Sequence, residues 1–236
     1  EGFFQLFIFN FETFIIIFNS IPIEITWFIF LIISFSTVLI FLKFFGEAGL
    51  YVYTTVAIIA ANIQVLKIVK FSFFVDPVAL GTILFASTFL CTDILAEYYG
   101  TKSARKNILL GFSGFLLMTV LMLFTIAFKP LNELTAGSNY DWALPVQNNL
   151  LEIFIPFPIF FASSMIAYLS SQFFDVWFFE KISKFTNKKF LWLRNNFSTF
   201  ISSLIDNTVF SILAWIIFNP NPLDFNDTQV RLWTQA

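Results

Sequence analysis

Two carboxylates lie one helical turn apart at the end of a long apolar run. Residues 91–106 read CTDILAEYYGTKSARK, and the thirteen residues before them, VALGTILFASTFL, contain no charged side chain. At a spacing of i and i+4, Asp93 and Glu97 point from one face of a helix. Two like charges this close disfavour each other's ionised form, so the pair needs either a proton or a nearby cation, for which Arg105 is placed. The pair is suited to an ion-pair clamp in a loop or to a site that binds or gates a polar solute.

A third carboxylate lies inside the apolar stretch FSTFISSLIDNTVFSILAW. Thr199, Ser202, Ser203 and Asp206 recur at i, i+3, i+4 and i+7, which places them on one helix face, and Asn207 widens this polar stripe. An ionisable group at the centre of a bilayer costs about 3 kcal/mol, so it usually faces the bundle interior or a cavity. The hydroxyl groups alone are equally compatible with hydrogen bonds between helices. The Asp–Asn pair favours a functional site.

Two further apolar stretches contain buried-amide candidates. Gln172 and Asp175 continue a second polar stripe, which begins at Ser164 and Tyr168. Asn62 lies in AANIQVLK. Asp175 is close enough to a helix end to be interfacial, whereas Gln172 is too deep for that explanation.

The composition identifies the class of protein. Of 236 residues, 58% are hydrophobic and 12% are charged, against roughly 25% charged residues in soluble domains. This chain could not cover a water-facing surface, so we predict an integral membrane protein. It contains no His, which excludes a Ser-His-Asp triad and the commonest zinc ligand. With a single cysteine, Cys91, it has no internal disulfide framework.

A helix that crosses the bilayer needs about 20 mostly apolar residues. Six stretches meet this requirement: 27–43, 49–69, 77–96, 107–128, 153–174 and 199–219. We therefore expect an all-α fold in which residues 1–236 form a single transmembrane domain of about six helices in one bundle. Residues 1–22 form a hydrophobic segment whose placement the pattern leaves open. Because the chain starts at Glu1 rather than Met, we expect it to be part of a longer protein.

Lys and Arg set the orientation, because they collect in cytoplasmic loops. The connections between the third and fourth spans and between the fifth and sixth hold eight of the thirteen basic residues. The connection at 131–149 holds none and should face outward. Lys67 and Lys70 lie near an outer end and argue weakly against this assignment.

Three separated motifs together are similar to those of a known family. They are TDxxAExYGxxxAR at 92–105, QxxD at 172–175 and RNxxSTxxxxxxDxxxF at 194–210, within a match that runs from about Ala60 to Phe218. This pattern resembles the queuosine precursor transporter family, also called the vitamin uptake transporter family. The resemblance implies a multi-pass protein of the bacterial inner membrane that imports 7-deazaguanine bases or queuine for tRNA modification. It implies no enzyme activity, cofactor or metal. The family usually has a further helix after the outer tail, where this chain ends at Ala236.

The resemblance also points to individual positions. The matching residues are Asn62, Lys67, Asp93, Glu97, Arg105, Gln172, Asp175, Arg194, Asn195, Ser198, Thr199 and Asp206. A guanine-like base presents a ring N–H beside an exocyclic amine, and one carboxylate can accept both. We expect Asp206, Gln172 and Asn62 to form one base-reading cluster near the midplane. The full set expected to bind substrate is Asn62, Gln172, Asp206, Asn207, Thr199 and Ser203. The set expected to form a cytoplasmic gating network is Asp93, Glu97, Arg105, Asp175 and Arg194.

The expected partners follow from the same reading. They are a deazaguanine base, the lipid bilayer, and either further copies of the chain or a separate energising subunit. Nucleic acid is not among them. The sequence has no GxxxxGK[ST] motif, so ATP could drive import only through another protein.

Two other functions remain open on the residues. One is the substrate-binding membrane subunit of a modular vitamin uptake system. The other is an intramembrane aspartyl protease that uses Asp93 and Asp206, since such chemistry needs two carboxylates close together. Against the protease, Asp93 follows Leu-Cys-Thr rather than a Gly-x-Gly sequence, and it is expected at the cytoplasmic end while Asp206 is expected deep in the membrane.

Overall fold

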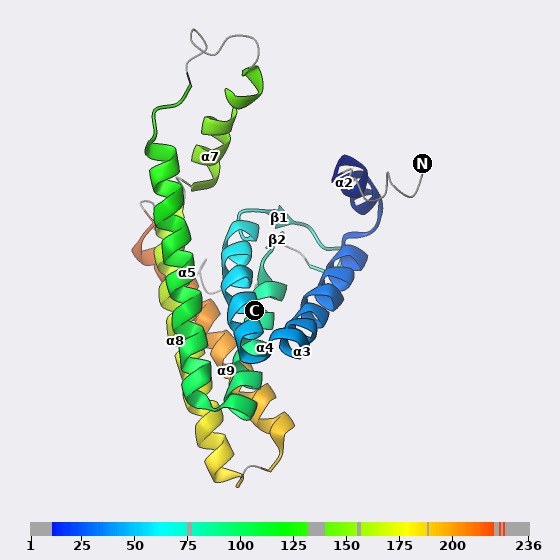
Figure 1. The fold of residues 1–236 in the computed structure, drawn as a ribbon, viewed down its shortest axis with the longest axis vertical. Coiled ribbons are helices and arrows are strands. Elements are labelled where there is room, and N and C mark those ends of the chain that lie inside the picture. Colours follow the sequence, from blue (N-terminus) through cyan, green and yellow to red (C-terminus); the bar gives the residue numbers. More distant parts are fainter. Residues whose placement is uncertain are drawn as a thin grey trace.

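The computed structural model describes residues 11–74, 77–131, 140–154, 157–187, 189–219, 222 and 224. The α-helices in chain order are α2 (Phe11–Ser20), α3 (Ile23–Gln64), α4 (Thr82–Ile94), α5 (Thr101–Ala127), α7 (Val146–Phe154), α8 (Phe157–Phe185) and α9 (Leu191–Ser211). Shorter elements are β1 (Ile68–Val69), β2 (Val78–Ala79), the π-helix η1 (Leu95–Tyr99), the 3-10 helix η2 (Asp141–Ala143) and the π-helix η3 (Ile212–Ile217). The described chain is a helical bundle with a small hairpin at one end (Figure 1), so the all-α prediction is confirmed.

The helix α3 consists of two halves that meet at Gly46. Gly46 has φ +57° and ψ −135°, a conformation outside the helical region that glycine adopts without a side-chain penalty. The first half diverges from the bundle and the second half packs beside α4 (Figure 1). Near the kink the halves touch through Tyr53, whose hydroxyl donates to the carbonyl of Ser34 at 3.2 Å and to Ser87 Oγ of α4 at 2.9 Å.

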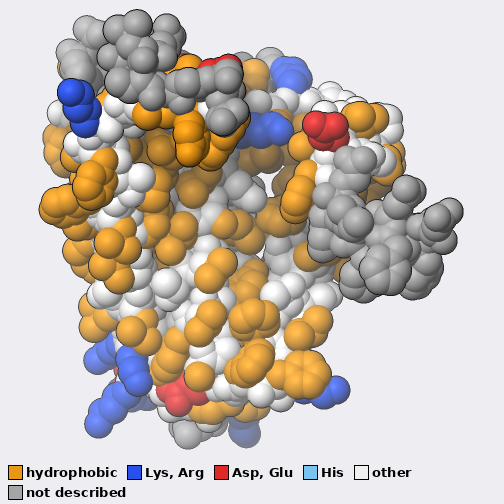
Figure 2. Space-filling model, turned by 45° about the horizontal axis from the view of Figure 1, so that its top comes forward, with side chains coloured by type: hydrophobic (Ala, Val, Ile, Leu, Met, Phe, Trp, Pro, Cys, Tyr) orange, Lys and Arg blue, Asp and Glu red, His pale blue; other side chains and the backbone are white. Residues whose placement is uncertain are grey.

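The helices have the length and surface of membrane-spanning segments. Within the described chain, three helices are long and apolar enough to cross a bilayer: Ile23–Gln64, Thr101–Ala127 and Leu191–Ile217. α8 adds a helix of 29 residues. Hydrophobic side chains spread over the middle of the face in Figure 2, where a soluble protein would present polar groups. The molecule is a polytopic helical membrane protein.

A β-hairpin replaces the ends of two expected spans. The second span was expected to continue to Val69, but α3 ends at Gln64, and the third was expected from Pro77, but α4 begins at Thr82. Between them β1 and β2 pair antiparallel, with Ile68 opposite Ala79. A short apolar run is compatible with a strand or with a buried helix, so hydropathy could not distinguish the two. For the N-terminal segment, residues 1–10 lie outside the described residues, and 11–20 form α2.

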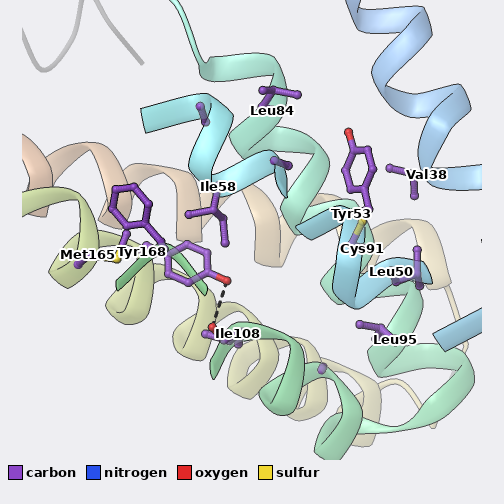
Figure 3. Close-up of a cluster of buried hydrophobic side chains, with 14 of the residues drawn as sticks. Val38, Leu50, Tyr53, Ile58, Leu84, Cys91, Leu95, Ile108, Met165 and Tyr168 are labelled. Carbon is purple, nitrogen blue, oxygen red and sulfur yellow. Dashed lines mark hydrogen bonds between the residues drawn. The ribbon is translucent and has the colours of Figure 1, made fainter. Parts of the chain in front are cut away.

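The core lies where α3, α4, α5 and α8 meet. Buried apolar side chains from these helices form one cluster, shown in part in Figure 3, with Leu50, Ile58 and Ile108 fully buried. The hydroxyl of Tyr168 on α8 crosses this cluster and donates to the carbonyl of Ile108 on α5 at 3.4 Å. The core therefore fixes α8 relative to the helices that precede it.

The two basic connections lie at the same end of the bundle. The η1–α5 junction and the α8–α9 turn are both at the lower end in Figure 1, and the hairpin and α7 are at the upper end. Several Lys and Arg side chains project from the lower end in Figure 2. By the rule that basic loops stay inside, we expect the lower end to face the cytoplasm.

Replacing Gly49 by Ala should destabilise the fold. A Cβ at Gly49 would overlap the backbone carbonyl of Phe41, so the two halves of α3 would have to move apart. Overpacking of this kind costs about 1–3 kcal/mol. We expect Tm in detergent to fall by roughly 2–12 °C, as a protein of this size loses about 2–4 °C per kcal/mol.

The matched control is Gly114→Ala in α5. There the new methyl group would meet the side-chain methyl of Thr55 rather than backbone, so a change of one rotamer can relieve the overlap. Its Tm should fall less than that of Gly49→Ala, and an equal loss for both variants would contradict the close approach at Gly49.

Candidate functional site

One face of α9 supplies polar groups to both α4 and α8. The Thr199 hydroxyl donates to Asp93 Oδ2 of α4 at 3.3 Å, and the Ser202 hydroxyl donates to Asp175 Oδ1 of α8 at 3.0 Å. One turn further along, Asp206 Oδ1 accepts a hydrogen bond from Ser171 of α8 at 2.9 Å. The polar stripe of α9 therefore lies on its protein-facing side.

A cavity of about 100 Å³ opens beside Asp206. Residues Val78–Leu80, from β2 and the position after it, line the cavity together with residues of α4, α8 and α9. Asp206 and Asn207 supply its carboxylate and its amide, and Phe85 and Phe210 supply aromatic rings. A polar, flat solute would find both hydrogen-bonding groups and apolar surface here.

Below this cavity, Gln172 lies in a closed network between α8 and α4. Its Nε2 donates to Thr88 Oγ1 at 3.0 Å, and its Oε1 accepts from Thr92 Oγ1 at 2.9 Å. Asn107 of α5 donates to Thr92 Oγ1 at 3.5 Å. Gln172 is 1% exposed. Both ends of its amide are engaged, so its first role is to join the two helices.

Two carboxyl groups meet beneath that network. Asp93 on α4 and Asp175 on α8 are 4% and 0% exposed, and their carboxyl groups lie close enough to interact. The hydroxyls of Thr199 and Ser202 approach them from α9, as described above. Three helices thus converge on a single pair of acids.

A buried ion pair closes the lower end of the bundle, where the basic connections lie. Arg194 is 1% exposed; its guanidinium lies 3.0 Å from Glu97 of η1, donates to Ser183 Oγ at 2.6 Å and stacks over the ring of Phe179. Arg105 was expected to pair with Asp93 or Glu97, and this is wrong. It lies 3.7 Å from Glu180 at the protein surface, because it starts the next helix on the side that faces α8.

The expected base-reading cluster is divided among three environments. Asp206 borders the cavity, Gln172 is bonded to α4, and Asn62 donates to the carbonyl of Ile58 within its own helix at 2.8 Å. Asn207 also lines the cavity, whereas Thr199 bonds Asp93 and Ser203 is half-buried on α9. No hydrogen bond joins these residues to one another within the described chain, and the base-reading cluster remains a prediction.

The gating set is divided as well. The structure brings Asp93 to Asp175 and Glu97 to Arg194, and it leaves Arg105 apart from both pairs.

Sequence analysis missed several residues that shape the site. Ser171 donates a hydrogen bond to Asp206. It was not predicted as a site residue because the neighbouring Gln172 was the more polar candidate. Asn107 was read as the start of an apolar span, although an amide inside such a run is itself a signal. Phe85 and Phe210 could not be chosen among 37 phenylalanines.

Removing Arg194 should unfold the cytoplasmic end more readily than removing Arg105. Breaking a fully buried ion pair costs about 3–5 kcal/mol. Because the Glu97 side chain is 29% exposed, we expect a smaller loss for Arg194→Ala, about 2–4 kcal/mol. Thermal unfolding in detergent would record it as a fall in Tm of at least about 4 °C.

The control is Arg105→Ala, whose pair with Glu180 has side chains that are 51% and 31% exposed. An exposed pair contributes at most about 1 kcal/mol. A double-mutant cycle of Arg194→Ala with Glu97→Ala isolates the pair itself. Strictly additive losses would show that the two side chains do not interact.

Comparison with known proteins places this chain in a family. A family described as "Putative vitamin uptake transporter" matches residues 79–234. A protein of Bacillus subtilis (strain 168) named "Probable queuosine precursor transporter" is 36% identical over 195 residues, which cover 82% of this chain and 80% of that protein. No solved structure matches. The matched region contains α4, α5, α8 and α9, which build the cavity, the acid pair and the ion pair. The chain belongs to the vitamin uptake transporter family, as the resemblance of its motifs indicated.

Proposed function

We propose that this protein imports queuosine precursors, that is 7-deazaguanine bases or queuine, across the bacterial inner membrane. The observation that carries the proposal is Asp206, an acid that borders a partly open cavity between the helices. The printed name of the Bacillus relative supplies the class of substrate. The geometry of the cavity supplies a reason for that class.

Asp206 has the chemistry to read the edge of a guanine-like base. A carboxylate has two oxygens and about four lone pairs, and Ser171 uses only one of them. The remaining capacity suits a ring N–H and an exocyclic amine held side by side, and Asn207 offers an amide to a carbonyl or ring nitrogen. Hydrogen bonds to a charged group are each worth about 1.5–3 kcal/mol.

Phe85 and Phe210 have the chemistry to hold the flat faces of the base. Both rings border the cavity, one from α4 and one from α9. Stacking of a base on an aromatic ring is worth about 1–3 kcal/mol in nucleic-acid complexes. Together with Asp206 they would select a planar heterocycle with donors on one edge.

The position of the cavity agrees with import. It lies beneath the hairpin at the end opposite the basic connections, and the Glu97–Arg194 pair closes the cytoplasmic end. A base would therefore enter from outside and leave past the acid pair and the ion pair. Further copies of the chain or a separate subunit would assemble around this unit rather than form the cavity.

Replacing Asp206 by Asn should abolish import while leaving the fold intact. The amide keeps the shape but loses the charge and replaces one acceptor by a donor. A loss of about 1.5–3 kcal/mol corresponds to a fall of at least tenfold in apparent affinity. The measurement is tRNA queuosine in a strain that neither makes nor imports the precursors, supplied with each base at limiting concentration.

Asp141→Asn is the matched control, because it makes the same change at an exposed position in η2. It should restore modification as well as the wild type does. Unimpaired import by an Asp206→Asn protein would remove Asp206 from the site. Failure of the inserted wild-type protein to restore modification with any of the bases would overturn the proposed function.

A further inference from the structure

The carboxyl groups of Asp93 and Asp175 form a contact that their surroundings do not neutralise. They come from different helices, are almost fully buried, and lie close enough to interact. Two ionised carboxylates held at this separation repel each other strongly, and an isolated buried charge is costly. The contact is stable if a proton lies between the two groups, as in other carboxylate pairs.

A count of hydrogen bonds leads to the same conclusion. Asp93 Oδ2 accepts from Thr199, and Asp175 Oδ1 lies 3.0 Å from the Ser202 hydroxyl, whose single proton is shared with the carbonyl of Ser198 at 2.7 Å. The other two oxygens, Asp93 Oδ1 and Asp175 Oδ2, are buried and receive no hydrogen bond from any described residue. Buried polar atoms are nearly always satisfied. One protonated carboxyl group, donating to the other, provides the donor that these oxygens lack.

The charged and titratable groups around the pair do not substitute for a proton. Glu97 on η1 and Arg194 on α9 neutralise each other at 3.0 Å. Asp206 on α9 is engaged with Ser171, and Tyr168 on α8 donates to α5. Cys91 on α4 is a buried thiol, and α5 contributes the amide of Asn107. Within the described chain no Lys or Arg nitrogen lies within 4.0 Å of Asp93 or Asp175.

A metal cation fits the pair less well than a proton does. A hard cation needs several oxygen ligands at about 2.3–2.6 Å around itself. To sit between Asp93 and Asp175 it would have to separate two groups that already lie close enough to interact. A proton occupies that contact without moving either helix.

We propose that Asp93 and Asp175 hold one shared proton and that its transfer from the outside to the cytoplasm drives import. This rests on the proposed function, because the solute that moves with the proton is the deazaguanine base. The proton enters with the pair facing outside, sits in an O–H···O bond between the carboxyl groups, and leaves to water at the cytoplasmic end. Each cycle moves one proton and one base, and no covalent bond in the base changes.

Coupling follows from the way α9 is shared. Asp206 at the cavity lies one turn from Ser202, which holds the acid pair, and Arg194 lies near the start of the same helix. Loss of the proton leaves two negative charges in contact, which favours separation of α4 from α8. If α9 moves when α4 and α8 separate, the position of Asp206 at the base site and that of Arg194 in its ion pair change together. By linkage, a base that favours one position of α9 also favours the proton state that belongs to it.

The first test detects the proton without any substrate. Infrared spectra of the purified protein at pH 7 should show a protonated carboxyl band that is lost in the Asp93→Asn/Asp175→Asn double variant. Asp206 is present in both proteins, so its carboxyl band cancels in the difference spectrum and cannot account for the lost band. Absence of such a difference would overturn the shared proton, whatever the protein transports.

The second test separates coupling from substrate recognition. In proteoliposomes, counterflow of labelled against unlabelled base reports binding and exchange, whereas accumulation driven by an inside-alkaline pH gradient reports coupling. We expect Asp175→Asn and Asp93→Asn to show counterflow within about threefold of the wild-type rate. Their accumulation of base driven by the pH gradient should be at least about tenfold lower than that of the wild type, because only the coupling to protons is lost. Glu180→Gln, a change at a half-buried position nearer the end of the same helix α8, should retain both activities.

The outcomes are distinct for the two proposals. Counterflow without any response to the pH gradient, or accumulation driven by sodium alone, would overturn proton coupling and leave the proposed substrate intact. Accumulation that survives in both Asn variants would also overturn it. Absence of counterflow in the wild type would overturn the proposed substrate, while the infrared test would still decide whether the pair holds a proton.

Discussion

Polar groups buried in a membrane bundle must be satisfied by one another, because the surrounding lipid offers no hydrogen bonds. This constraint determines how α4, α8 and α9 fit together. The hydroxyls of Thr199 and Ser202 find acids on two other helices, and Gln172 bridges α8 to α4 with both ends of its amide. Apolar packing alone would leave the rotation of each helix weakly defined, since lipid tails are as apolar as leucine. The polar contacts fix that rotation.

Three layers of polar contact follow one another along α9. Asp206 borders the cavity, Ser202 and Thr199 contact the acid pair, and Arg194 closes the end that carries the basic connections. Each layer pairs α9 with α4, η1 or α8, so a rigid shift of α9 alters all three. A transporter needs the outer and inner barriers to change in opposite senses, and a single helix that touches both is a direct physical link.

The fold followed from the sequence wherever the signal was local. Apolar runs of membrane-spanning length predicted the all-α bundle, and the basic loops predicted which connections share one end. The hairpin at Ile68–Ala79 did not follow, because an apolar pair such as Ile68–Val69 has the same hydropathy in a strand as in a helix. The break at Gly46 did follow from the sequence, because the expected spans 27–43 and 49–69 leave residues 44–48 as the connection between them, and Gly46 lies in that connection.

The site was predictable as a set of residues but not as a set of contacts. Asp93 and Glu97 stand at i and i+4, and in a regular α-helix they would share one face. The chain enters the π-helix η1 at Leu95, and its wider turn changes the direction of every side chain that follows. Asp93 therefore meets Asp175, while Glu97 meets Arg194. The same acids on a continuous α-helix would compete for one cation, and the π-helix gives each of them a different partner.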